Sequence, residues 1–254
     1  QPLSQIIYNQ IVENNIDLVN GYSGGANIAL LDAFHNEKYN TENKVKLIKS
    51  SNEMNSGFVA EGYAKSSNKP GIILSTSGPG VTNVITPLLD GLYDGVPMIS
   101  LTGQVATTAP PDPFQGSPAV DLTKPCTKFS YKINSILEFP LMLDYLFKLC
   151  QFERPGPVHL DIPKDFQFHK GIYKLKKTNL TRKLNGSKSN KINLKDVDTF
   201  IEMMKSSSKP IFYTGGGVIN SGPKASELLR ELVALTGFPI TTTLQGLGSY
   251  PGDD

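Results

Sequence analysis

Short apolar runs alternate with amphipathic segments along most of the chain, and glycine, proline or polar turns separate them. Apolar residues at helical spacing predict helices over 3–15, 28–34, 84–93 and 139–152. Compact apolar runs predict strands over 17–19, 45–48, 72–74 and 96–101, and a further helix is predicted to begin at Glu53 and to continue through Ala64. Strands that alternate with helices indicate an α/β fold with a parallel sheet.

Glycines or polar residues follow each of the first four predicted strands. They are Gly24 and Gly25, then Glu53, then Ser77 to Pro79, then Gly103 and Gln104. Because the carboxyl ends of parallel strands share one edge of the sheet, where open α/β sheets bind ligands, we expect these residues to lie together. Taken alone, the two glycines also fit an ordinary turn, and Glu53 also fits a helix N-terminus stabilised by the helix dipole.

The segment from Lys49 to Gly80 carries the most specific pattern. It contains Asn-Glu-Met-Asn, then Ala-Glu-Gly-Tyr-Ala, a short apolar run, and Thr-Ser-Gly-Pro-Gly, followed by Val-Thr-Asn. These motifs resemble the pyrimidine-binding domain of thiamine-diphosphate (ThDP) enzymes, and most closely the N-terminal part of the large catalytic subunit of acetolactate (acetohydroxyacid) synthase. Arg-Pro-Gly-Pro-Val-His-Leu-Asp-Ile-Pro-Lys-Asp at 154–165 matches that family's closing strand, so the resemblance covers nearly the whole chain.

The resemblance implies a ThDP site at the predicted sheet edge. Glu53 would hydrogen-bond N1′ of the aminopyrimidine ring and favour the imino tautomer that removes the C2 proton, which requires a carboxyl group in a dry pocket. Ser23 stands where the family's thiazolium-facing loop has proline. The residues implied on the ThDP side are Gly24, Gly25, Glu53, Pro79, Asn83 and Gln104.

A loop rich in proline and glycine at 109–118 contains Asp-Pro-Phe-Gln, which resembles the family's Asp-Ala-Phe-Gln substrate loop. A plain solvent loop is the alternative. The resemblance implies that Gln115 is catalytic together with Glu53, and that Phe114, Gln115 and Lys164 contact the substrate. The implied reaction decarboxylates pyruvate to an enamine, which then condenses with a second 2-keto acid to give 2-acetolactate or a related 2-acetohydroxy acid.

Substrate choice stays open at this stage. Asn52 precedes Glu53, as in pyruvate and indolepyruvate decarboxylases, whereas the synthases usually have histidine there. Those decarboxylases also carry a His-His pair, and the histidines of this chain are the isolated His35, His159 and His169. The Gly-Pro-Gly and Phe-Gln loops favour the synthase, and another ThDP-dependent 2-keto acid decarboxylase or carboligase is the alternative.

A second α/β pattern begins near Asp196, with helices predicted over 197–204 and 225–236 and strands over 210–214 and 239–243. Its Gly-Gly-Gly run is not GxGxxG and is a weak nucleotide signal alone. By resemblance this is the start of a Rossmann-like middle domain that contacts FAD, a structural flavin in this family. Relatives that keep the fold without flavin leave FAD open. The residues implied on the FAD side are Arg154, Gly215, Gly216, Gly217, Thr243 and Leu244.

We predict a pyrimidine-binding domain at 1–170, a basic linker at 171–195 and the beginning of the middle domain at 196–254. The 254 residues contain no Gly-Asp-Gly, the motif that fixes Mg²⁺ and the diphosphate in the family. We therefore predict no metal ligand in this chain, Mg²⁺ ligands outside it, and a fragment that is inactive alone. A split enzyme completed by a partner chain is the second hypothesis. The resemblance also implies a homodimer or homotetramer.

The composition is that of an ordinary globular protein, with 39% hydrophobic and 19% charged residues and a net charge of +2. No apolar run is long enough to span a membrane and nothing resembles a secretory signal, so we expect a cytoplasmic protein without a membrane partner. Cys126 and Cys150 have no metal-ligand spacing and are expected to be reduced. The lysine-rich run at 171–195 lacks aromatic residues at regular spacing, so a solvated linker is preferred over nucleic-acid binding, the third hypothesis.

Overall fold

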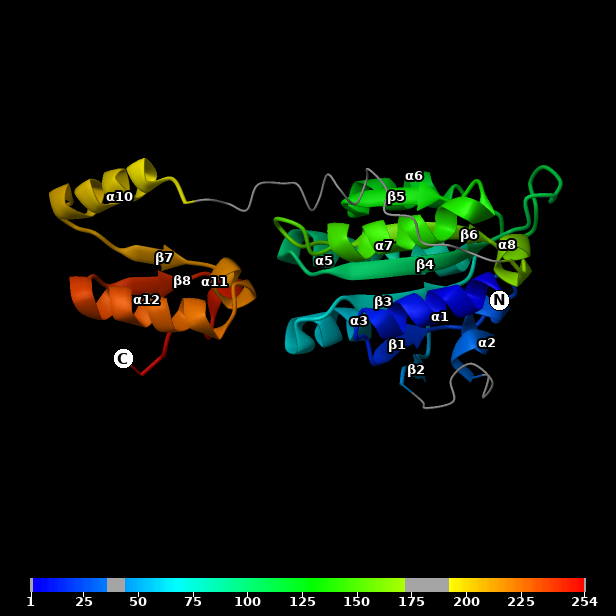
Figure 1. Ribbon diagram of the computed structural model, residues 1–254, viewed down its shortest axis with the longest axis horizontal. Helices are drawn as coiled ribbons and strands as arrows, with labels where there is room; N and C mark the ends of the chain where they lie inside the picture. The colour runs from blue at the N-terminus through cyan, green and yellow to red at the C-terminus, as the bar shows by residue number, and fades with distance from the viewer. Residues whose placement is uncertain (1, 36–43, 172–191, 254) are drawn as a thin grey trace. The chain divides into compact units, whose positions relative to one another are not determined.

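A computed structural model describes residues 2–35, 44–171 and 192–253. The chain divides into two compact units, 1–187 and 188–254, and Figure 1 shows the helices and strands of each. Most of the predicted linker lies outside the described residues, so the predicted domain limits at 170 and 195 stay predictions.

Six parallel strands form the sheet of the first unit, in the order β2-β1-β3-β4-β6-β5. The strands are β1 (Leu18–Gly21), β2 (Lys46–Lys49), β3 (Gly71–Ser75), β4 (Met98–Gln104), β5 (Phe129–Lys132) and β6 (Val158–Pro163). Every residue of β3, β4 and β6 is buried, as expected for central strands of a parallel sheet that helices cover on both faces. The predicted α/β fold with a parallel sheet is confirmed.

Two layers of helices cover the sheet (Figure 1). One layer contains α1 (Leu3–Glu13), α2 (Ile28–His35), α7 (Phe139–Leu149) and α8 (Lys164–Phe168), and the other contains α3 (Glu53–Ser67), α4 (Pro79–Asn83), α5 (Ile85–Asp94) and α6 (Ala119–Thr123). The larger apolar core lies under the first layer and a smaller one lies under the second. Cys126 and Cys150 are buried free cysteines within this unit.

The helix α3 begins at Glu53 because Asn52 caps it. The Asn52 side chain accepts a hydrogen bond from the backbone N–H of Asn55 at 2.8 Å, which satisfies one of the free donors of the first turn. At the other end Asn68 adopts a left-handed conformation, with φ of 57°, and stops the helix. The cap therefore fixes the position of Glu53 at the first residue of α3, shortly after the end of β2.

Most predicted helices and strands are present, with shifted ends. The predicted strand at 96–101 is wrong at both ends, since β4 runs from Met98 to Gln104, and Gly103 and Gln104 belong to the strand instead of following it. The elements that we did not predict in this unit include β5, α6, α8 and two 3-10 helices, Lys124–Cys126 and Ile136–Glu138. β5 is an edge strand of partly exposed residues, so it lacks the apolar run that marks a buried strand.

The second unit is a short β-α-β arrangement. Its strands β7 (Phe212–Thr214) and β8 (Ile240–Thr242) pair in parallel, and its helices are α10 (Leu194–Ser206), α11 (Gly216–Asn220), α12 (Pro223–Thr236) and the 3-10 helix Leu244–Gly246. α11 was predicted only as a glycine turn. Among the residues that the structure describes, no helix in either unit is long and apolar enough to cross a membrane.

Candidate functional site

The carboxyl edge of the first sheet brings together the residues predicted on the ThDP and substrate side. Gly24 and Gly25 follow β1, Glu53 follows β2, Pro79 follows β3, Gln104 ends β4, Phe114 and Gln115 lie in the loop after β4, and Lys164 follows β6. All six strands are parallel, so these positions lie at one edge of the sheet. Arg154 precedes β6 and lies at the opposite edge.

Glu53 is buried at this edge, with 5% of its surface exposed. Its Oε2 accepts a hydrogen bond from Nδ2 of Asn83 on α4 at 2.9 Å, and Oε1 accepts none from the described residues. A Cβ atom added to Gly80 would lie 3.4 Å from Oε1, so a glycine at 80 leaves room beside this oxygen. An oxygen of a buried carboxyl group that has no partner among the described residues is placed to accept a hydrogen bond from a ligand.

Thr76, which was not among the predicted site residues, connects the two glycine turns. Its Oγ1 accepts a hydrogen bond from the backbone N–H of Ala26 at 3.2 Å. A Cβ atom on Gly24 would lie 2.4 Å from Thr76 Cβ, and one on Gly80 would lie 2.9 Å from Thr76 Cγ2. Thr76 therefore fills the space between the loop after β1 and the turn after β3, and both turns need glycine there.

The loop that carries Phe114 and Gln115 meets the Gly78-Pro79-Gly80 turn at Gly78, whereas Glu53 lies beside Gly80. Gln115 has a left-handed backbone with φ of 59°, and a Cβ atom added to Gly78 would lie 2.9 Å from the Gln115 carbonyl oxygen. The Phe114 side chain is 89% exposed. The predicted substrate loop thus rests on the same turn that borders Glu53.

The Gln104 side chain points into the protein and is 3% exposed. Its Nε2 donates to Asp161 Oδ2 at 2.8 Å and to the Ser117 carbonyl at 3.1 Å, while its Oε1 accepts from the Val105 N–H at 2.9 Å. These contacts use both ends of the amide within this chain. Its predicted place on the ThDP side therefore stays a prediction.

A buried polar network lies beside Gln104 and includes His159. The Thr102 hydroxyl donates to Asp161 Oδ1 at 2.7 Å and lies 2.8 Å from Nε2 of His159. Because that hydroxyl has one hydrogen, Nε2 is the donor and carries the proton, and Nδ1 accepts from Thr123 or Ser130, each at 2.9 Å. Burial lowers the pKa of His159 to about 3 and raises the pKa of Asp161, so the imidazole is neutral near pH 7.

Two family descriptions match the chain. "Thiamine pyrophosphate enzyme, N-terminal TPP binding domain" matches residues 2–120, and "Thiamine pyrophosphate enzyme, central domain" matches residues 197–254. Thiamine pyrophosphate is another name for ThDP. The chain belongs to the thiamine pyrophosphate enzymes.

Several relatives of this chain within the thiamine pyrophosphate enzymes are named as acetolactate synthases. The mitochondrial acetolactate synthase catalytic subunit of Saccharomyces cerevisiae is 37% identical over 98% of this chain. Acetolactate synthase 2, chloroplastic, of Brassica napus and the chloroplastic acetolactate synthase of Arabidopsis thaliana are each 35% identical over 99% of it. The chain spans 36%, 38% and 36% of the lengths of these three relatives.

The family's central-domain match contains most of the residues predicted on the FAD side. Thr243 follows β8 and its N–H donates to the Thr214 carbonyl at the end of β7 at 2.8 Å. A Cβ atom on Gly215 would lie 3.5 Å from Thr243 Oγ1, and one on Gly217 would meet nothing within 4 Å. Leu244 is 79% exposed. The glycine run and Thr243-Leu244 therefore lie together at the carboxyl ends of the two strands.

Arg154, the remaining residue of that predicted set, belongs to the first unit of this thiamine pyrophosphate enzyme. Its Nη2 donates to the Tyr93 carbonyl. The Lys128 ammonium donates to the carbonyls of Leu149, Phe152 and Arg154 at 2.8, 2.6 and 2.8 Å, respectively. These bonds hold the backbone between α7 and β6, and with it the base of the Arg154 side chain.

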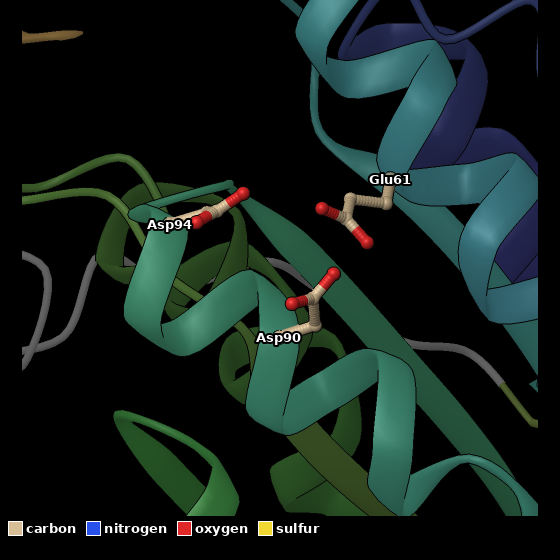
Figure 2. Close-up of side chains that lie close together, drawn as sticks. All are labelled: Glu61, Asp90 and Asp94. Carbon is tan, nitrogen blue, oxygen red and sulfur yellow. The ribbon is translucent and has the colours of Figure 1, made fainter. Parts of the chain in front are cut away.

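Three carboxyl groups also gather between α3 and α5. Figure 2 shows Glu61, Asp90 and Asp94, whose oxygens lie within 4.8 Å of one another. Burial raises the pKa of Glu61. Nζ of Lys65 lies 2.7 Å from Glu61 Oε1 and 2.7 Å from Asp94 Oδ2. Since this ammonium supplies the counter-charge, the cluster carries no metal assignment.

The two glycines after β1 should respond differently to the same substitution. Gly24→Ala places a methyl group against Thr76 and should lower the free energy of unfolding by about 1–3 kcal/mol through overpacking. Gly25→Ala places it in open space and should change stability by less than about 0.5 kcal/mol. Urea-induced unfolding of the first unit measures both. Equal losses in the two variants would contradict the described loop geometry.

Proposed function

We propose that this chain supplies the pyrimidine-binding half of a ThDP site in an enzyme that condenses 2-keto acids to a 2-acetohydroxy acid such as acetolactate. The observation that carries the proposal is the buried carboxyl group of Glu53, with Asn83 on one oxygen and room beside Gly80 at the other. The 37% identity to the yeast acetolactate synthase catalytic subunit supports the choice of reaction.

The residues at the sheet edge fit the aminopyrimidine ring of ThDP. Oε1 of Glu53 is available to hydrogen-bond the ring nitrogen N1′, and the bond from Asn83 to Oε2 holds the carboxyl group in one orientation. A hydrogen bond to a carboxyl group in a dry site is stronger than one in water. Bound ThDP supplies the thiazolium carbon that attacks the keto group. Gly25 and Pro79 would line the cofactor without side chains that crowd it.

The substrate side follows from the same edge. Phe114 and Gln115 would face the reacting end of the cofactor, because their loop rests on Gly78. Lys164, exposed after β6, would attract the carboxylate of a 2-keto acid. Asn52 caps α3, which accounts for this asparagine without reference to substrate and leaves the synthase reaction preferred over a decarboxylase.

Further parts of the proposal lie beyond the contacts of this chain. Mg²⁺ would be held by residues outside it, FAD would contact Arg154, Gly215–Gly217 and Thr243–Leu244, and the enzyme would assemble as a homodimer or homotetramer. A cytoplasmic location is also proposed, although the three relatives above are named as mitochondrial or chloroplastic. Immunolocalisation with an organelle marker would decide the location.

Two assays test the proposed reaction. A longer protein of the relatives' length should form acetolactate from pyruvate only when ThDP and Mg²⁺ are present, and formation of product without ThDP, or none with it, would refute the enzyme assignment. Calorimetric titration of ThDP and Mg²⁺ into the 254-residue chain should give no measurable binding. Micromolar, Mg²⁺-dependent binding to this chain would instead refute the half-site, since diphosphate ligands would then be present in it.

A further inference from the structure

One side chain holds both ends of the loop that carries Phe114 and Gln115. Oε1 of Gln104 accepts the N–H of Val105, where the loop leaves β4, at 2.9 Å. Nε2 of Gln104 donates to the carbonyl of Ser117, just before α6, at 3.1 Å. The two ends of this loop, defined as residues 105–117, therefore meet at a single buried amide.

We propose that Gln104 is a positioning residue that closes the base of the 105–117 loop and so sets where Phe114 and Gln115 lie. The proposal rests on the proposed function for what the loop contacts, but the closure itself depends only on contacts within this chain. A loop whose ends are joined has fewer conformations to explore, so the position of its tip is better determined.

The carboxylate of Asp161 determines which way the Gln104 amide faces. An ionised carboxylate only accepts hydrogen bonds, so its Oδ2, 2.8 Å away, requires the Nε2 end of the amide. That orientation leaves Oε1 facing the Val105 N–H. With the amide reversed, two oxygens would face each other and Val105 would lose its acceptor. Asp161 therefore acts on the loop through Gln104.

Two further contacts limit the motion of the loop. Asp165, in α8, accepts from the Thr107 N–H at 3.1 Å and from the Thr107 hydroxyl at 2.5 Å. Near the tip, the Gln115 backbone lies against Gly78, where a Cβ atom would come within 2.9 Å. Gln104 is the contact that joins the two ends, whereas these two restrain one point each.

The test measures the opening of the loop in the 254-residue chain. Phe114 is exposed and is a chymotrypsin site, and cleavage after it requires the loop to open locally. Gln104→Met keeps the length of the side chain and removes all three hydrogen bonds. We expect cleavage after Phe114 to become about tenfold faster or more, and the Val105 amide to lose its protection from hydrogen exchange, because bonds of ~1 kcal/mol each are lost.

Thr102→Val is the matched control. It removes a hydrogen bond from the same Asp161 carboxylate at 2.7 Å and a contact with His159 at 2.8 Å, but no described hydrogen bond to the 105–117 loop. It should change global unfolding to a similar extent as Gln104→Met and leave cleavage after Phe114 at the parent rate. The proposal is overturned if Gln104→Met leaves the cleavage rate and the Val105 exchange unchanged, or if Thr102→Val accelerates cleavage equally.

The link to catalysis is measured separately. In a longer protein that forms acetolactate, Gln104→Met should raise KM for the 2-keto acid and lower kcat/KM. If Gln104→Met accelerates cleavage after Phe114 but leaves kcat/KM at the parent value, the positioning role is overturned. An inactive parent protein would refute the proposed function, while the cleavage result would still decide whether Gln104 closes the loop.

Discussion

Glu53→Gln should reduce acetolactate formation by a longer, active protein about 100-fold or more while leaving the fold intact, since positioned acid–base groups contribute about 10²–10⁴ in rate. In the parent, Nδ2 of Asn83 donates to Glu53 Oε2 at 2.9 Å, and the amide oxygen of glutamine can accept the same bond. The start of α3 at residue 53 should therefore not change. What is lost is the carboxyl group that the proposed mechanism places against N1′ of the cofactor.

The effect of Glu53→Gln is measured as kcat with saturating ThDP and Mg²⁺, beside the thermal unfolding of the 254-residue chain carrying the same change. Glu13→Gln serves as the control, because it alters an exposed carboxyl group at the end of α1. Activity within a few-fold of the parent would remove Glu53 from the mechanism. Activity lost together with the folded structure would show a structural role instead.

His159→Leu should make the first unit less sensitive to acid. The folded-state pKa of His159 is lowered by burial from 6.5 to about 3, so below pH 6.5 the unfolded chain binds a proton that the folded chain cannot. Above pH 6.5 the neutral His159 therefore does not reduce the free energy of unfolding of the parent. That free energy falls progressively as the pH is lowered from 6.5 toward 3. At 1.36 kcal/mol per pKa unit, the loss is about 3 kcal/mol at pH 4.

The quantity to compare is the difference in the free energy of unfolding between the parent and His159→Leu at each pH. Asp161 and Glu61 have raised pKa values and oppose the trend, but both are present in parent and variant. Leucine should be tolerated because the Thr102 and Thr123 hydroxyls keep acceptors in Asp161 and the Ala119 carbonyl. Urea unfolding between pH 7 and pH 4 measures the effect, with the exposed His169 changed to glutamine as control. Parallel curves for parent and His159→Leu would contradict a buried neutral imidazole.

The parts of the fold that could be predicted from the sequence are those with local causes. The apolar runs of β3 and β4, the glycine turns after the strands and the start of α3 near Glu53 all depend on residues close in the chain. The edge strand β5 escaped prediction because its residues are partly exposed and give no apolar run. α11 escaped because a glycine run indicates a turn before it indicates a helix.

The site could be placed at the sheet edge but not assembled in detail. Thr76 was missed because its role depends on Gly24, which is adjacent only in the folded sheet. Gln104 was predicted on the ThDP side by resemblance, but its hydrogen bonds to Asp161 and Ser117 could not be predicted, because the direction of a strand side chain depends on which face the register assigns to it. Its hydrogen-bond partner Asp161 is in β6, far along the chain, and no local pattern links the two residues.

The order of the strands has a consequence for how the protein is made. β6, the last strand of the sheet to be synthesised, lies between β4 and β5 and pairs with both. A ribosome that has not yet released residues 158–163 therefore holds a nascent chain in which the facing edges of β4 and β5 have no partner strand. Unpaired edges associate with other chains, so premature termination in this region should yield aggregates rather than a smaller folded unit.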